Sequence, residues 1–364
     1  MPTQTAQNRQ LLPHFGQLLP SKPTPMGLDV GNSATKALIG NEQMSIPSYV
    51  QPIYTKLHQL PAEGFVRYVA GNYAELHGKR WLAGKAAYQR NPEAYLRVCD
   101  DKQAKITQAL PLVLGALSYV PFQELWDLRV VASIHHAREM GGALKQALEG
   151  THTVQLNDHS GPTHVSITVL KVLDEGAGAV ATAGLTNGQN LIYDFGGGTT
   201  IISVFGEKGR LINRQVSPGG ANALIDAIAT NPDVIRRESG EADRETIRRG
   251  IENDTFAYGL QSPWDMEPVY QQEVRPWMST VLRTALKAGD KWQRNCNRVI
   301  AIGGGAQLPL VTEVLEKKGI ETLTDSAWAK GLYGILCKRS IIPIHQEIAP
   351  WPARKKNQTA SMNC

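Results

Sequence analysis

The feature that most constrains the fold of this chain is a pair of apolar strands. Each of them ends in an aspartate and is followed by a glycine-rich turn. The first unit is Leu28-Asp29-Val30-Gly31-Asn32-Ser33-Ala34-Thr35-Lys36, and the second is Tyr193-Asp194-Phe195-Gly196-Gly197-Gly198-Thr199-Thr200. An apolar run follows each turn, so each unit predicts a β-hairpin, over residues 26–40 and 191–205. Because the same plan opens each half of the chain, we interpret the sequence as a weak internal duplication.

The composition of the two turns indicates a phosphate site. Backbone N–H groups of glycine-rich turns converge on phosphate oxygens, and hydroxyl side chains add donors. Lys36 supplies a positive charge that can reach outer phosphates. A carboxylate beside a phosphate is repulsive unless a cation lies between them, so Asp29 and Asp194 predict Mg²⁺ held largely through water. The alternative for either turn alone is an ordinary hairpin turn with Asp and Gly.

A third glycine turn, Gly303-Gly304-Gly305-Ala306, follows the apolar strand 299–302 and has no acid. A backbone without side chains can lie flat against a purine and ribose, and a helix is expected to begin near Pro309. Glu175 lies where a predicted strand ends and a small-residue helix begins, a place that suits a carboxylate orienting a water molecule for phosphoryl transfer. The alternative for Glu175 is an acid in the first turn of a helix, favoured by the helix dipole.

Composition excludes several other classes of protein. The chain has 364 residues, 42% hydrophobic and 20% charged, which predicts two domains or one large bilobed domain. Its net charge of +5 is far below that of a dedicated nucleic-acid binder, so no direct sequence-specific DNA binding is expected. The four cysteines show no metal or disulfide spacing, and no signal or membrane-spanning pattern is present, which favours the cytoplasm.

The rest of the chain predicts alternating strands and helices. Strands are expected over residues 128–134, 165–173 and 210–216, and helices over 104–118, 137–149, 175–184, 221–230 and 270–293. Residues 41–91 carry several prolines and predict an irregular inserted subdomain, whereas the charge-rich residues 232–254 predict an exposed helical one. Pro276 is interpreted as the start of the last long helix, since proline is tolerated in a first turn.

These motifs resemble the actin-like ATPase superfamily, which includes actin, sugar kinases and the 70-kDa heat-shock chaperones. The units around Asp29 and Asp194 are similar to its two phosphate motifs, and residues 301–306 are similar to its adenosine motif. Within the superfamily, the Asn/Ser/Thr turn before Lys36, the position of Glu175 and the segment 328–333 resemble the plasmid-segregation actins of the ParM/StbA type.

The resemblance implies an α/β fold of two related lobes, each a mixed β-sheet flanked by helices, with a nucleotide cleft between them. It places lobe I at residues 26–187 with a small subdomain at about 41–95. Lobe II is placed at 188–331 with a small subdomain at about 221–290, and a C-terminal helix at 332–345 is expected to return to lobe I. Residues 1–25 are predicted to be a flexible arm and 346–364 a flexible basic tail.

The resemblance also assigns roles to individual residues. Asp29 and Asp194 would hold hydrated Mg²⁺, and Glu175 would polarise the attacking water, so these three residues are the catalytic candidates. The nucleotide would be bound by a larger set of turn residues: Gly31, Asn32, Ser33, Lys36, Gly196, Gly197, Gly198, Thr199, Gly219, Gly220, Gly303, Gly304, Gly305 and Ala306.

The function implied is a polymerising protein that hydrolyses ATP or GTP with Mg²⁺ and forms dynamic head-to-tail filaments. Head-to-tail contacts need not close on themselves, so polymer is the natural outcome. The filament would position plasmid or other DNA through a DNA-binding adaptor protein, without a membrane. Two alternatives on the same fold stay open, a small-molecule kinase and a non-polymerising nucleotide-binding scaffold.

Overall fold

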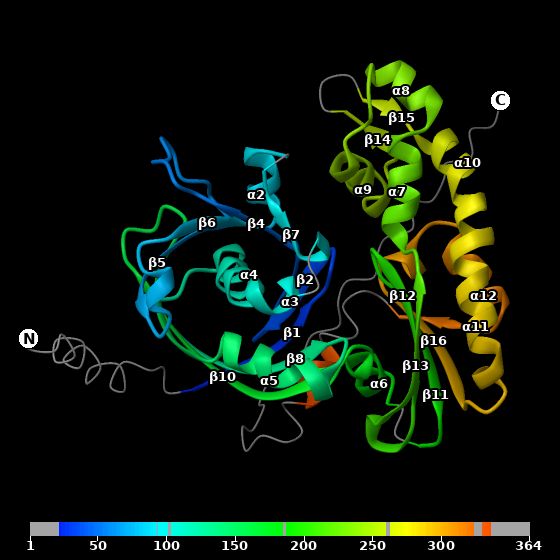
Figure 1. Cartoon of the computed structure of the whole chain (residues 1–364), viewed down its shortest axis with the longest axis horizontal. Helices are drawn as coiled ribbons and strands as arrows, with labels where there is room; N and C mark the ends of the chain where they lie inside the picture. The colour runs from blue at the N-terminus through cyan, green and yellow to red at the C-terminus, as the bar shows by residue number, and fades with distance from the viewer. Residues whose placement is uncertain are drawn as a thin grey trace, which may run out of the picture.

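The computed structural model describes residues 22–92, 94–100, 103–184, 187–259, 263–323 and 330–335 of the chain. These residues form two lobes that lie side by side, with the N-terminal lobe on the left of Figure 1. Most of the predicted N-terminal arm, the predicted tail and most of the predicted helix 332–345 lie outside the described residues. Of that helix, residues 332–335 are helical and continue from residue 330.

Each lobe is built on a sheet of the same topology. In lobe I the strand order is β3-β2-β1-β8-β10, and in lobe II it is β13-β12-β11-β16-β17. In both, three antiparallel strands linked by hairpins are followed by two strands that run parallel to the first. The predicted duplication is therefore present in the backbone. The bounds in lobe I are β1 Thr24–Val30, β2 Ala34–Ile39, β3 Glu42–Pro47, β8 Leu125–Ile134 and β10 Thr163–Asp174. Those in lobe II are β11 Asn190–Phe195, β12 Thr199–Phe205, β13 Leu211–Pro218, β16 Arg298–Ile302 and β17 Glu321–Thr322.

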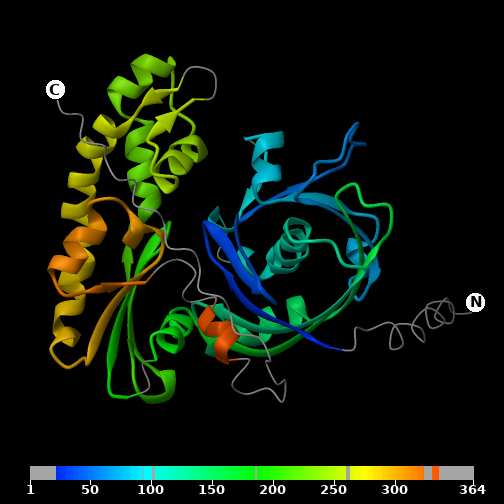
Figure 2. The same cartoon turned by 180° about the vertical axis from the view of Figure 1, so that it is seen from behind.

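Lobe I extends its sheet by five more strands, which lobe II does not have. They continue the order as β9 (Gly150–Leu156), β5 (Phe65–Gly71), β6 (Arg80–Ala83), β4 (Tyr49–Pro52) and β7 (Leu96–Arg97). The extended sheet curls around helix α4 (Ala109–Ala116), as Figure 2 shows from behind. Every residue of α4 except Pro111 is buried, which explains why this helix is apolar on all sides.

The prediction that residues 41–91 are irregular was wrong. Four strands and helix α2 (Lys85–Arg90) lie there, and the strands belong to the main sheet. Pro47 and Pro52 are the last residues of β3 and β4, where a missing N–H removes no necessary ladder bond. In β5, Val66 and Tyr68 are buried while Arg67 is exposed, so the alternation of a half-buried strand was present in the sequence.

The remaining helices of lobe I follow the predicted pattern closely. The predicted helix 104–118 is divided at Gln108 into α3 (Ala104–Thr107) and α4, and Pro111 stands in the first turn of α4. A residue in that turn has no intrahelical N–H partner, so proline is tolerated there. The lobe is completed by α5 (Ala137–Leu148) and α6 (Ala177–Thr182).

Lobe II carries a helical layer whose long helix corrects one expectation. The helix begins at Glu267 as α10 (Glu267–Trp277), passes through a π-helical turn (Met278–Leu282) and continues as α11 (Arg283–Gln293). Pro276 therefore lies inside the helix and does not start it. The π turn directly after the proline changes the hydrogen-bond spacing where proline disturbs the ladder. The other elements are α7 Ala221–Ala229, α8 Pro232–Glu238, α9 Arg244–Glu252, β14 Ala257–Tyr258, β15 Trp264–Asp265 and α12 Val311–Lys317.

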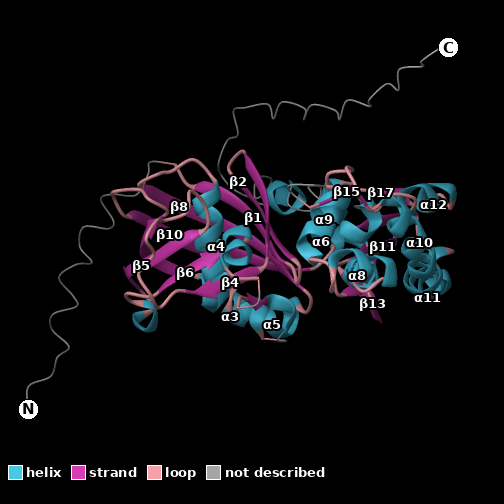
Figure 3. Ribbon diagram, turned by 90° about the horizontal axis from the view of Figure 1, so that it is seen from above, coloured by secondary structure: helices cyan, strands magenta, loops and turns pink. Residues whose placement is uncertain are grey.

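Each lobe has its own apolar core, and a smaller cluster joins them. Phe205 and Ile302 of lobe II pack in this cluster with Leu38 and Val131 of lobe I. The two lobes stand as separate blocks when seen from above in Figure 3. We call this contact between the lobes the joint. It places the two hairpin turns opposite one another. None of the described helices is both long enough and apolar enough to cross a membrane.

Candidate functional site

The two aspartates lie at equivalent places in the two sheets. Asp29 is in β1, opposite Lys36 of β2 and beside Ser133 of β8, whose hydroxyl donates to its Oδ1 at 2.7 Å. Asp194 is in β11, beside Ile302 of β16. Both carboxylates thus project from the first strand of a hairpin, next to the parallel strand of their own sheet. The fold brings the two strands face to face across the joint.

The charges of these aspartates act on each other and on Glu175. Loss of water raises the pKa of Asp29 to about 6 and that of Asp194 to about 7, and the negative charge of Glu175 adds to both shifts. Asp29 in turn contributes to the raised pKa of Asp194, whereas Lys36 lowers both. Three carboxylates therefore share one poorly solvated space. Lys36 and Lys105 act against the rise in the pKa values of the two aspartates but do not fully offset it.

This excess of negative charge fits a magnesium ion. Carboxylate oxygen is the ligand that Mg²⁺ prefers, and the ion usually keeps several of its waters. Within the described residues, no group of three or more His, Cys, Asp or Glu side chains could hold a metal directly. The donor set accordingly fits a hydrated ion beside Asp29 and Asp194 better than a metal enclosed by protein ligands.

The two phosphate-type turns approach each other closely. A Cβ on Gly197 would lie 1.8 Å from the hydroxyl oxygen of Ser33, so only glycine permits this approach. Asn222, at the start of α7, donates to the same hydroxyl at 3.3 Å. Gly31 is also closely packed, since its Cβ would lie 2.6 Å from the Ala34 carbonyl oxygen.

The Gly219-Gly220 pair packs against the backbone of the second turn. A Cβ on Gly220 would lie 2.3 Å from the Gly196 carbonyl oxygen, and the indole of Trp277 donates to the Gly220 carbonyl at 2.8 Å. Gly198 has no atom within 4 Å of its Cβ position, so its backbone faces open space. Thr199 is the first residue of β12 and is half-buried.

The third turn packs against the end of β11. Gly303 has a φ of 87°, and a Cβ there would lie 2.7 Å from Oδ1 of Asp194. A Cβ on Gly305 would lie 2.8 Å from the Cβ of Phe195. Ala306 is fully buried. Gly304 has no atom within 4 Å of its Cβ position and is open. A flat ligand would therefore meet the backbone of Gly304, while Gly303, Gly305 and Ala306 position that backbone.

Glu175 is the first residue after β10 and is held by a buried lysine that sequence reasoning missed. Nζ of Lys105, in α3, lies 2.5 Å from Oε1 of Glu175, and the two side chains are 8% and 10% exposed. Burial opposes the charge of Glu175, but Lys105 outweighs it and lowers the pKa of the carboxyl below its ordinary value. Glu175 is therefore ionised while both aspartates have raised pKa values.

We expect Lys105→Met to destabilise the protein by about 3–5 kcal/mol, because it leaves a buried carboxylate without its partner. The double variant Lys105→Met/Glu175→Gln removes both charges and should recover most of that loss. Lys145→Met is the matched control, because Lys145 pairs with Glu149 at the surface (3.2 Å, side chains 49% and 33% exposed) and should lose about 0–1 kcal/mol. Urea denaturation measures all three, and equal losses for the two single variants would contradict the expectation.

The structure adds Ser133, Lys105, Asn222 and Arg214 to the predicted site residues. Lys105 and Ser133 reach the site from elements that carry no motif, and Asn222 and Arg214 reach it across the joint. A polar Ser133 at the end of the apolar strand 128–134 was the only signal in the sequence. The other three residues look like ordinary surface residues in the sequence, and only the fold buries or half-buries them.

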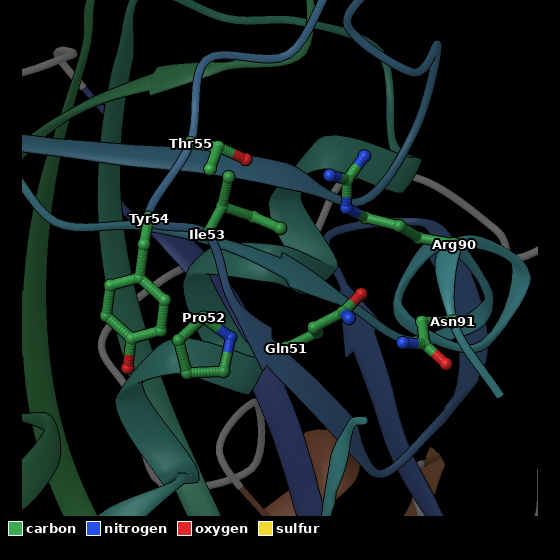
Figure 4. Close-up of a pocket in the computed structure, with 7 residues that line it drawn as sticks. All are labelled: Gln51, Pro52, Ile53, Tyr54, Thr55, Arg90 and Asn91. Atoms are coloured by element: carbon green, nitrogen blue, oxygen red, sulfur yellow. The ribbon is translucent and has the colours of Figure 1, made fainter. Parts of the chain in front are cut away.

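Two cavities lie near or outside this site. The first, of about 550 Å³, lies between the lobes and is bounded by Asn32 and Ser33 on one side and by Asn222 and Arg248 on the other. The second, of about 410 Å³, lies in lobe I at the end of β4 and α2, where Figure 4 shows its lining residues. No predicted site residue lines this second cavity.

Comparison with known proteins agrees with this geometry. Residues 27–178 match the family described as actin like proteins N terminal domain. No protein of curated function matches the chain in sequence. Among solved structures, an archaeal actin homologue in complex with ADP is 17% identical, with a TM-score of 0.65 over 87% of this chain and 100% of the other.

Two ParM structures are also similar. A non-polymerisable quadruple mutant of pCBH ParM is 15% identical, with a TM-score of 0.64 over 87% of this chain and 100% of that one. A 15-stranded ParM filament from Clostridium botulinum is also 15% identical, with a TM-score of 0.61 over 87% of this chain and 99% of that one. At these identities the likeness shows the fold. Residues 27–178 therefore resemble an actin-like N-terminal domain, and the chain has the bilobed fold of these ParM and archaeal actin homologue structures.

Proposed function

We propose that this protein hydrolyses ATP or GTP with Mg²⁺ and couples hydrolysis to the assembly of dynamic filaments. The observation that carries the proposal is the meeting of Asp29 and Asp194, from equivalent hairpins of the two lobes, with Glu175 in one poorly solvated space. The archaeal actin homologue in complex with ADP, whose fold this chain shares, supports nucleotide binding.

Different residues of the site have different roles in the proposed hydrolysis. The ionised carboxylate of Glu175 accepts a hydrogen bond from a water molecule and orients it toward the terminal phosphorus. The water oxygen bonds to that phosphorus, the bond to the bridging oxygen breaks, and nucleoside diphosphate and inorganic phosphate leave with one proton released to solvent. A bound Mg²⁺ would offset the charge that accumulates on the phosphate oxygens. Lys36, opposite Asp29, lies on the strand that follows the first turn and adds a second positive charge.

Assembly into filaments rests on the fold and on its relatives. The similar structures include a ParM filament and an Alp12 filament, and the match with this chain covers 99% of each of those chains. Nucleotide between the lobes would favour one arrangement of the lobes, and hydrolysis would shift the population back. We further propose that such filaments position plasmid or other DNA in the cytoplasm through an adaptor protein.

Light scattering of the purified protein tests the proposal directly. Scattering should rise after addition of Mg-ATP or Mg-GTP, should not rise when EDTA replaces Mg²⁺, and should fall as phosphate is released. Hydrolysis per molecule should accelerate with protein concentration, because the proposal couples hydrolysis to assembly. A flat trace at high protein concentration with either nucleotide would contradict assembly.

The cavity of about 550 Å³ favours a small-molecule kinase as the second candidate. It borders Asn32 and Ser33 of the first turn, where an acceptor would face the terminal phosphate. A kinase would consume nucleotide only when an acceptor is added, and its rate per molecule would not depend on protein concentration. The same assay therefore separates the two functions.

A further inference from the structure

Arg214 is a buried arginine of lobe II whose guanidinium reaches into lobe I. It lies in β13, the edge strand of the lobe II sheet, and its side chain is 8% exposed. Its Nη2 donates to the backbone carbonyl of Glu175 at 2.9 Å, and its Nη1 donates to the carbonyl of His135. The Asp174 carboxylate lies 3.6 Å from Nη1. One side chain thus binds the residues that follow two neighbouring strands of the other lobe, β8 and β10.

The guanidinium is also fixed within its own lobe. Its Nε donates to the hydroxyl of Ser203, in the neighbouring strand β12, at 3.2 Å. The donors of arginine lie in one rigid plane, so bonds on opposite edges of that plane fix the position of both sets of acceptors. Arg214 therefore joins the lobe II sheet to the Glu175 backbone with little freedom.

Glu175 is restrained by the two lobes at two different points. Its carboxylate is paired with Lys105 of lobe I, whereas its carbonyl is held by Arg214 of lobe II. The next residue, Gly176, has a φ of 91°, and a Cβ there would lie 3.1 Å from the ring of Phe205 in lobe II. A movement of lobe II relative to lobe I therefore pulls directly on the turn that carries Glu175.

We propose that Arg214 is a positioning residue that makes the placement of the Glu175 carboxylate depend on the arrangement of the lobes. The inference rests on the proposed hydrolytic function. With the lobes as they stand here, Arg214 holds the turn so that Glu175 faces the space shared with Asp29 and Asp194. When the lobes separate, the carbonyl is displaced with β13 while Lys105 retains the carboxylate, so the water-orienting geometry is lost.

Kinetics of Arg214→Gln and Arg214→Lys test this role. Both variants should lower kcat about 10- to 100-fold, the cost of a displacement of about 1 Å, with KM changed by less than about threefold. Lysine keeps the charge but cannot bind two carbonyls in one plane, so it should not rescue. The matched control is Arg298→Gln, because Arg298 also donates from lobe II to a carbonyl, that of Ala183 at 2.9 Å, away from Glu175. Its kcat should stay within about twofold of the wild type.

Hydrogen exchange of the nucleotide-free protein supplies a readout independent of turnover. Arg214→Gln should speed amide exchange in residues 135–137 and 175–178, whereas Arg298→Gln should not. Ser203→Ala, a small change that preserves folding, should give the same pattern at smaller amplitude. Full activity of Arg214→Lys, or unchanged exchange in Arg214→Gln, would overturn the inference while leaving hydrolysis by the wild type intact. A wild type without hydrolysis would overturn the proposed function and this inference together.

Discussion

Replacing Glu175 by glutamine is expected to lower kcat for nucleotide hydrolysis about 10²- to 10⁴-fold, the usual contribution of a side chain that is positioned to act on the attacking water. Glutamine fills the same volume, and its amide oxygen can still accept a hydrogen bond from Lys105, 2.5 Å from Oε1 in the native pair. Nucleotide binding should therefore change little, because Glu175 acts on water. Release of inorganic phosphate, measured with and without Mg²⁺, gives kcat, and fluorescent nucleotide titration gives the dissociation constant.

The matched control for this variant is Glu245→Gln. Glu245 is also buried and paired with a cation, Arg248 at 3.1 Å, but it lies in α9 on the far side of the cavity. Both variants remove one buried ion pair, so a shared loss of stability cancels in the comparison. If Glu245→Gln lowered kcat as much as Glu175→Gln, the special role of Glu175 would be disproved. Filaments of Glu175→Gln should form with nucleotide and persist, because assembly precedes hydrolysis.

Replacing Asp194 by asparagine is expected to weaken binding of Mg-nucleotide about 10- to 100-fold, the range found when groups that orient a metal's ligands are removed. The asparagine oxygen can still accept a hydrogen bond from a water of the ion but carries no charge to offset it. Isothermal titration with Mg-ADP measures the effect. Asp233→Asn is the control, because Asp233 lies on the surface of the same lobe, where its carboxylate pairs with Arg236 at 3.1 Å. Equal weakening by both variants would contradict the metal role.

The same substitution should stabilise the nucleotide-free protein in a pH-dependent way. Burial raises the pKa of Asp194 from its usual value of 3.8 to about 7, so folding disfavours its ionised form. That penalty is complete above pH 7, shrinks as pH falls between about 7 and 4, and is absent below 4, where the carboxyl is protonated in both states. Asparagine is neutral at every pH. Asp194→Asn should therefore raise the free energy of unfolding by about 4 kcal/mol at pH 8 and by almost nothing at pH 4. An advantage that grew as pH fell would refute this account.

Together these two variants separate binding from chemistry. Asp194→Asn should lose affinity and gain stability in the absence of nucleotide, since functional sites are commonly less stable than their neutral substitutes. Glu175→Gln should keep affinity and lose turnover. The two aspartates and the glutamate share one space, yet burial and neighbouring charges push their pKa values in opposite directions.

The sequence by itself determined the local units of the fold. The apolar runs that end in Asp29 and Asp194, with glycines directly after, specified two hairpins because the alternation and the turn residues are local properties. The buried strand 128–134 and the helix 137–149 were specified in the same way, and both are present within a few residues of the predicted bounds. The prediction for residues 41–91 was wrong because prolines at strand ends were interpreted as a sign of irregular structure.

Only the tertiary structure decided which distant groups meet. Lys105 carries no motif, and its pairing with Glu175 depends on the curled sheet that places α3 beside the end of β10. Arg214 and Asn222 belong to one lobe and bind groups of the other, so their roles exist only after the two sheets have packed together. Sequence patterns report periodicity and turn chemistry over a few residues, whereas desolvation and charge coupling depend on the complete fold, and these set the properties of the site.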